Sequence, residues 1–187
     1  MSKKAKGASS PEQDIHCAVL SDDDIAVVRV HGRGSFQNSV FLERFAKHLQ
    51  EQGRPAEFIV DLGECETLDS TFMGMLASVS QTQKRAGRHQ LVVVNVNDHV
   101  RRLLKTLGLT YLLEIHESET TRATDALAKA DLKPAEQEDI SRLDQILHTL
   151  EAHKTLVELD GENEVRFQSV IHYLERSVKN MEKGKEF

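Results

Sequence analysis

Apolar residues in the first two thirds of the chain follow two alternating periods. Short runs rich in Val, Ile and Phe begin near residues 25, 58 and 91, about every 33 residues. They are too short for helices, and they consist of residue types that favour strands. Between them, apolar residues recur three or four positions apart, which is the period of a helix. This spacing is the length of a β-α-β unit, so the pattern predicts a parallel sheet with helical crossovers.

The first element differs from the repeating pattern. Runs 15–20 and 25–31 are both β-rich, and the polar residues 21–24 separate them, which predicts an antiparallel hairpin. The later elements all follow from their apolar period and their Gly or Pro boundaries. Helices are expected at 35–50, 69–85, 98–107 and 119–130, and strands at 58–62, 91–96 and 111–115. The predicted fold class is therefore α/β, with a mostly parallel sheet and an antiparallel edge hairpin, packed with helices.

The rest of the chain divides by composition. Residues 1–14 hold three Lys and almost no apolar side chains, which favours a disordered basic tail before a domain at 15–130. Residues 131–139 are acidic and contain a Pro, as in a linker. Two apolar stripes of helical period within 140–182 predict an antiparallel helical hairpin. Two helices bury too little surface to fold alone, so their stripes should pack on the first domain or form a homo-oligomer.

Charge and composition exclude several classes of function. The net charge of −6 argues against a nucleic-acid partner, because phosphate backbones require a basic surface. The longest unbroken apolar runs have four residues, such as 91–94, whereas a bilayer span needs about 20. The start lacks the apolar core of a secretory signal. We therefore expect a cytoplasmic protein with no membrane contact.

Cysteine and histidine usage predicts no metal and no cofactor. Cys17 and Cys65 provide neither a disulfide framework nor a four-thiolate zinc site. His148 and His153 are the one close pair on an expected helix, and their spacing places them about 140° apart around its axis. We interpret them as solvated helix histidines.

Residues 61–76 form the segment with the clearest chemical potential. They run from a buried strand through an acidic loop into the start of an apolar helix, where Asp69 or Ser70 is placed to cap. A cap alone is the more common role for such residues. A second interpretation uses the same geometry, because a hydroxyl on the first turn faces solvent near the positive end of the helix dipole. Phosphorylation there would add about −1.5 to −2 charges to an already acidic loop.

Two motifs resemble the STAS family, the sulfate transporter and anti-sigma factor antagonist domains, over about 15–130. The first motif is Asp69-Ser70-Thr71-Phe72-Met73-Gly74 after a strand that ends in Asp61. The second is Val100-Arg101-Arg102-Leu103-Leu104 followed by Gly108-Leu109, after a strand. The resemblance implies the STAS fold and a role in signal transduction and transcription regulation.

The antagonist branch of this family implies a particular mechanism. Its serine after the Asp is phosphorylated by a serine kinase that is also the anti-sigma factor, and by position that residue is Ser70. The unphosphorylated form would bind the kinase and free a sigma factor, and a phosphatase would restore it. The implied partner-binding residues lie around this serine: Asp69, Ser70, Thr71, Phe72, Gly74, Ser35 and Phe36.

The sequence departs from the family pattern in two places. Phe72 stands where the family usually has the first Gly of the helix, and we expect it to narrow access or to form part of the contact surface. The loop Gly32-Arg33-Gly34-Ser35 lacks the acidic residue that the family commonly has near the phosphorylation site. Thr71 is a second candidate hydroxyl, although its side chain points about 100° away from that of Ser70.

Two alternatives compete with the phosphorylation switch. One is an unphosphorylated scaffold or transporter-associated STAS subunit, with a constitutive interface anchored by Phe72. The other is an enzyme that uses the carboxylates of Asp61, Glu64, Glu66 and Asp69. The enzyme is the weakest hypothesis, because no His base, Arg clamp or cofactor motif accompanies these carboxylates.

Overall fold

The computed structural model describes residues 15–20, 24–54, 57–135 and 140–183. The expected tail at 1–14 and the expected turn and linker residues at 21–23 and 136–139 therefore lie outside the described residues. Within the described ranges, no helix combines the length and the apolar character that crossing a membrane requires.

A mixed sheet forms the centre of the fold. Strands β1 (Ile15–Leu20) and β2 (Ile25–Val30) form the expected antiparallel hairpin, and β4, β6 and β7 extend the sheet from β2 in parallel. The strand order is β7-β6-β4-β2-β1-β8. The remaining bounds of this sheet are β4 (Glu57–Asp61), β6 (Val92–Val94), β7 (Glu114–Ile115) and β8 (Lys133–Pro134). The predicted fold class is confirmed.

Two strand pairings lie where no strand was expected. β8 pairs antiparallel with β1, so part of the expected linker is a sheet edge. A separate small sheet joins β3 (Gly32–Gly34) to β5 (Cys65–Leu68) in parallel. Both pairings are too short to produce a local period, and they depend on partners far away in the sequence.

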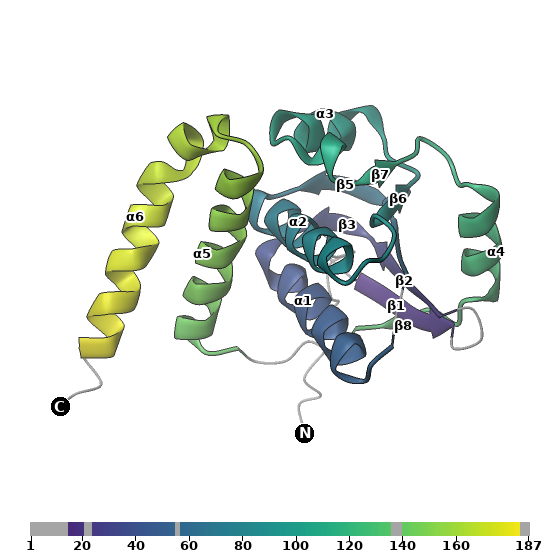
Figure 1. Cartoon of the computed structure of the whole chain (residues 1–187), viewed down its shortest axis with the longest axis horizontal. Coiled ribbons are helices and arrows are strands. Elements are labelled where there is room, and N and C mark those ends of the chain that lie inside the picture. Colours follow the sequence, from purple (N-terminus) through teal and green to yellow (C-terminus); the bar gives the residue numbers. More distant parts are fainter. Residues whose placement is uncertain (1–14, 21–23, 55–56, 136–139, 184–187) are drawn as a thin grey trace, which may run out of the picture.

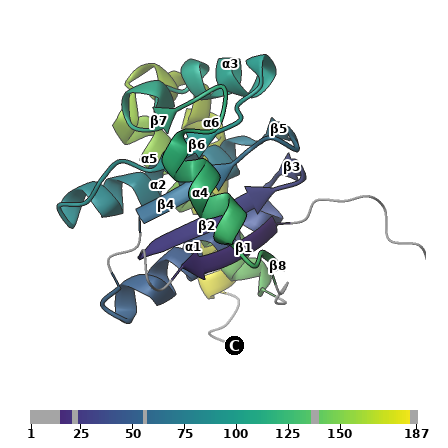
Figure 2. The same ribbon diagram turned by 90° about the vertical axis from the view of Figure 1, so that its right-hand side faces the viewer.

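The helices arrange in layers around the sheet (Figure 1). α1 and α2 cover one face of the sheet and α4 covers the other, while α3 lies at one end (Figures 1 and 2). α5 and α6 form an outer layer beyond α1 and α2. The bounds are α1 (Phe36–Glu51), α2 (Ser70–Arg85), α3 (Asp98–Thr106), α4 (Thr121–Lys129), α5 (Arg142–Leu159) and α6 (Glu162–Lys183), with a 3₁₀ turn at Leu109–Tyr111.

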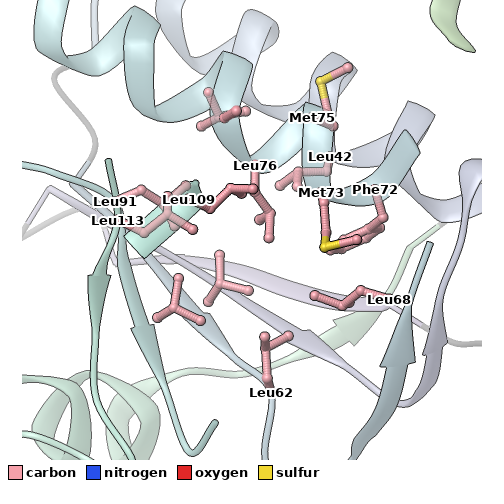
Figure 3. Packing of buried hydrophobic residues seen from close by; sticks show 14 of the residues in the cluster. Leu42, Leu62, Leu68, Phe72, Met73, Met75, Leu76, Leu91, Leu109 and Leu113 are labelled. Atoms are coloured by element: carbon pink, nitrogen blue, oxygen red, sulfur yellow. The ribbon is translucent and has the colours of Figure 1, made fainter. Parts of the chain in front are cut away.

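The main core lies between the sheet and the inner face of α2. Phe72 and Leu76 of α2 are fully buried with Leu62, which follows β4. Figure 3 shows Phe72 between the start of α2 and Leu68 of β5. A Cβ on Gly34 would lie 2.3 Å from Leu68 and 3.1 Å from the ring of Phe72. A glycine in β3 therefore allows the small sheet to close over the phenylalanine.

Candidate functional site

Asp69 holds the starts of two helices together. Its Oδ1 accepts a hydrogen bond of 2.8 Å from the backbone N–H of Phe72, which makes Asp69 the N-cap of α2. Its Oδ2 accepts from the backbone N–H of Phe36, the first residue of α1, at 2.9 Å. Its own N–H donates to the carbonyl of Gly34 at 2.8 Å. The cap interpretation of Asp69 is confirmed, and the same carboxylate fixes the loop before α1.

Ser35 and Phe36 therefore lie beside the start of α2, 33 or more positions away in sequence. Ser35 is the buried N-cap residue of α1, and its N–H donates to Asn38 Oδ1 at 2.7 Å. The ring of Phe36 is part-buried. The structure thus brings together Ser35, Phe36 and Asp69, three of the expected partner-binding residues.

The side chains of the first turn of α2 point in different directions. Thr71 is 5% exposed and Phe72 is 0% exposed, whereas Ser70 is half-buried. The expectation that Phe72 forms part of an exposed contact surface is therefore wrong in this conformation, because the helix turns the ring toward the sheet. Thr71 is likewise too buried to serve as an accessible second hydroxyl. Ser70 carries the less buried of the two first-turn hydroxyls.

The outer side of α2 is covered by α5. Gly74 lies one turn after Ser70, and a Cβ at this position would lie 2.3 Å from the backbone oxygen of Ala152. Ala152 belongs to α5 and is itself fully buried. The two backbones can approach this closely only because position 74 has no side chain. Gly74, an expected partner-binding residue, is thus in contact with the chain's own C-terminal hairpin.

His153 of α5 holds the hydroxyl of Ser70. The Ser70 Oγ lies 3.0 Å from His153 Nε2, and His153 Nδ1 lies 2.7 Å from the carbonyl oxygen of Thr149. A carbonyl can only accept, so Nδ1 carries the proton. Nε2 of the neutral ring then accepts, and Ser70 donates to it. The expectation of a free, solvent-facing hydroxyl is corrected here, because α5 covers it.

The interpretation of His148 and His153 as solvated helix histidines is also wrong. Both rings are buried, and each reaches the first domain. His148 Nε2 lies 2.7 Å from Ser39 Oγ of α1, and its Nδ1 lies 2.7 Å from Glu43 Oε2. This hydrogen bond lowers the pKa of Glu43 below its ordinary value. Two histidines five positions apart both turn inward because α1 and α2 present partners to different sides of α5.

Burial lowers the pKa of His153 below its ordinary value near 6.5, against opposing effects of the Thr149 carbonyl and the charge of Asp69. The unfolded chain therefore takes up a proton at this ring more readily than the folded chain. We expect the free energy of unfolding to decrease as the pH falls below about 6.5. Denaturant titrations between about pH 5 and 8, where Glu43 stays ionised, would measure this dependence of the free energy of unfolding on pH. His153→Gln should flatten this part of the profile, and an unchanged profile would contradict the assignment.

Three acidic residues of the enzyme hypothesis, Asp61, Glu64 and Asp69, have structural partners. Asp61 is 3% exposed and pairs with Arg29 at 2.7 Å. The same carboxylate accepts from the N–H of Gly63 at 3.0 Å and from Asn95 Nδ2 at 2.8 Å. Arg29 was not identified from the sequence, because it lies in β2, far from the motif. Among the described residues no group of three or more His, Cys, Asp or Glu could hold a metal ion.

The mixed sheet with Asp69 and Ser70 at the start of α2 defines a STAS-type domain. The chain belongs to the STAS-domain family: the family model described as "Mlab, STAS domain" matches residues 17–114, just over half of the chain. The match ends before α5 and α6, so the hairpin that covers Ser70 lies outside it.

Solved structures of similar fold share little sequence with this chain. The anti-sigma factor antagonist SpoIIAA in its unphosphorylated form aligns with a TM-score of 0.50 and 11% identity, over 62% of this chain and 98% of its own. The crystal structure of TM1081 from Thermotoga maritima, a protein assigned provisionally as an anti-sigma factor antagonist, aligns with a TM-score of 0.49 and 16% identity, over 61% of this chain and 92% of its own. The NMR structure of TM1081 aligns with a TM-score of 0.49 and 15% identity, over 69% of this chain and 96% of its own. No curated protein matches the sequence.

Proposed function

We propose that this chain is an anti-sigma factor antagonist of a partner-switching cascade. It binds an anti-sigma serine kinase while Ser70 is unphosphorylated, and phosphorylation of Ser70 releases it. A phosphatase resets the switch. The observation that carries this proposal is the position of Ser70: it directly follows the capping Asp69 in a STAS domain, and its hydroxyl is the less buried of the two on the first turn.

The surroundings of Ser70 explain why a phosphate would act as a switch. Asp69 already occupies the backbone N–H of Phe72, and two further carboxylates, Glu64 before β5 and Glu66 within it, are exposed. A phosphate would thus add about −1.5 to −2 charges to the negative charge of three carboxylates, and it could not accept a hydrogen bond from that N–H. A partner surface complementary to a neutral hydroxyl would be repelled.

Substitutions of Ser70 test the proposal. With a purified serine kinase of the anti-sigma type from the same organism, we expect the wild type and Ser70→Ala to bind. Ser70→Asp should bind about tenfold more weakly or worse, because it places a charge at the interface. Calorimetry measures the affinity, and intact mass after incubation with ATP should show one phosphate on the wild type and none on Ser70→Ala.

Ser118→Asp serves as the control, because Ser118 is exposed and lies outside this site. It should bind like the wild type. If the kinase binds Ser70→Asp as tightly as the wild type and transfers no phosphate, the switch is contradicted and the scaffold alternative is favoured.

One observation favours that alternative. The hydroxyl of Ser70 is already engaged by His153, so the start of α2 takes part in an interface within the chain. In a scaffold or transporter-associated subunit, this contact would be permanent and Ser70 would never be modified. Phe72, however, cannot be the anchor expected for that role, because it is buried in the core.

A further inference from the structure

We propose that the outer face of α2, from Ser70 to Gly74, is a helix-docking surface whose resident ligand is α5 of the same chain, and that a partner must displace α5 to bind there. This inference rests on the proposed function, since it concerns access to the same serine. It assigns the C-terminal hairpin a role as an intramolecular competitor.

The first argument is the shape of the surface. Helices normally pack 8–10 Å apart, and small residues at the contact permit the shorter distances. Gly74 provides such a contact, because the backbone of Ala152 lies where its Cβ would be. The surface is therefore suited to a helix that presents a small residue opposite Gly74. α5 meets this requirement with Ala152, and a competing partner would need a similar helix.

The second argument is that α5 is bound through polar groups of the site itself. His153 accepts a hydrogen bond from Ser70, and Nε2 of His148 lies 2.7 Å from Oγ of Ser39 in α1. These hydrogen bonds can be exchanged for bonds to water when α5 leaves, so their net contribution is small. The apolar part of the contact includes Leu156, which is fully buried within the main core cluster.

The hairpin has a separate attachment at its turn. The amide of Asn163, in the first turn of α6, donates to the carbonyl of Leu107 at 3.1 Å and, within the hairpin, to that of Leu156 of α5 at 2.8 Å. Arg166 also donates to the carbonyl of Thr106. The bonds to Leu107 and Thr106 hold the start of α6 against the end of α3. The attachment at the turn and the contact of α5 with α2 are therefore distinct.

A phosphate on Ser70 and a docked α5 exclude each other. Phosphorylation replaces the hydroxyl proton with a phosphoryl group, so Ser70 can no longer donate to Nε2 of the neutral His153 ring. The added oxygens would have to fit beside His153, which is only 4% exposed and whose ring centroid lies 4.8 Å from that of Phe167. The kinase, too, can reach the hydroxyl only after α5 moves. The hairpin thus gates both the binding and the modification of Ser70.

The accessibility of position 70 can be measured without any partner. In the full chain, Ser70→Cys supplies a thiol whose alkylation by iodoacetamide is followed by peptide mass spectrometry. Leu156→Ala removes buried contacts of α5 and leaves α2 unchanged. Because a Leu→Ala change in a core removes buried contacts and leaves a cavity, we expect alkylation of the introduced thiol to accelerate at least about tenfold. The milder Leu156→Val should give an intermediate rate.

Two internal controls separate local opening from unfolding. Leu147→Ala changes α5 at a position that is 42% exposed and should leave the rate unchanged. Cys65, which is buried in β5, should be alkylated as slowly as in the chain that carries Ser70→Cys alone. Equal alkylation rates of the introduced thiol in all variants, or acceleration of Cys65 in step with that thiol, would overturn the inference. Either result leaves the kinase experiment unaffected, so the two proposals can fail separately.

Discussion

Replacing Phe72 with alanine is expected to lower the free energy of unfolding by about 3–5 kcal/mol. The ring is completely buried between α2 and the small sheet. Its removal would leave a cavity against Gly34 and Leu68, and neither can fill it, since β3 is fixed by its pairing with β5. Urea denaturation followed by circular dichroism measures the change.

Tyr111→Ala is the matched control for the loss of an aromatic ring, because Tyr111 is 87% exposed. Its effect should stay within about 0.5 kcal/mol. If Phe72→Ala were as mild as Tyr111→Ala, or if it weakened partner binding without lowering stability, the ring would belong to a contact surface after all. The core assignment would then be wrong.

Gly74→Ala is expected to loosen α5 while leaving α2 intact. In the interior of a helix, alanine is favoured over glycine by about 1 kcal/mol. The new methyl group would, however, overlap the backbone of Ala152, which cannot rotate away as a side chain could. Overpacking of this kind costs about 1–3 kcal/mol. We therefore expect amide hydrogen exchange in α5 to accelerate about tenfold, as measured by mass spectrometry.

Gly161→Ala is the control for this variant, because nothing lies within 4 Å of the position of its Cβ. Exchange in α5 should then match the wild type. Slower or unchanged exchange in Gly74→Ala would show that the backbones of α2 and α5 do not approach as closely as described. It would also remove the steric basis for α5 as a ligand of this face.

The sequence predicted the secondary structure well wherever a helix or strand has a strong period of its own. α1, α2 and α3 begin and end within about two residues of the expected bounds, because glycines or prolines punctuate each of them. The hairpin of β1 and β2 and the parallel order of the central strands also follow from local pattern and crossover length. β3 and β5 were missed, since three or four residues cannot show a period.

The candidate site was predicted only in part, because a helical pattern identifies a buried face without identifying what covers it. Asp69 and Ser70 were found from capping chemistry, which is local. The contact of Ser70 with His153 joins residues 83 positions apart. No pattern in α5 indicates that contact, because histidines on a polar helix face normally remain in water.

The amino-acid sequence by itself determined the order of strands and helices in the first domain, the helix start that carries Ser70 and the existence of a C-terminal hairpin, since each depends on short-range periodicity and capping. Only the tertiary structure decided which way Phe72 points and which surface the hairpin covers. Both depend on packing between elements that are distant in the chain. The free energy of such contacts comes from desolvation and hydrogen bonds that form only when those elements meet.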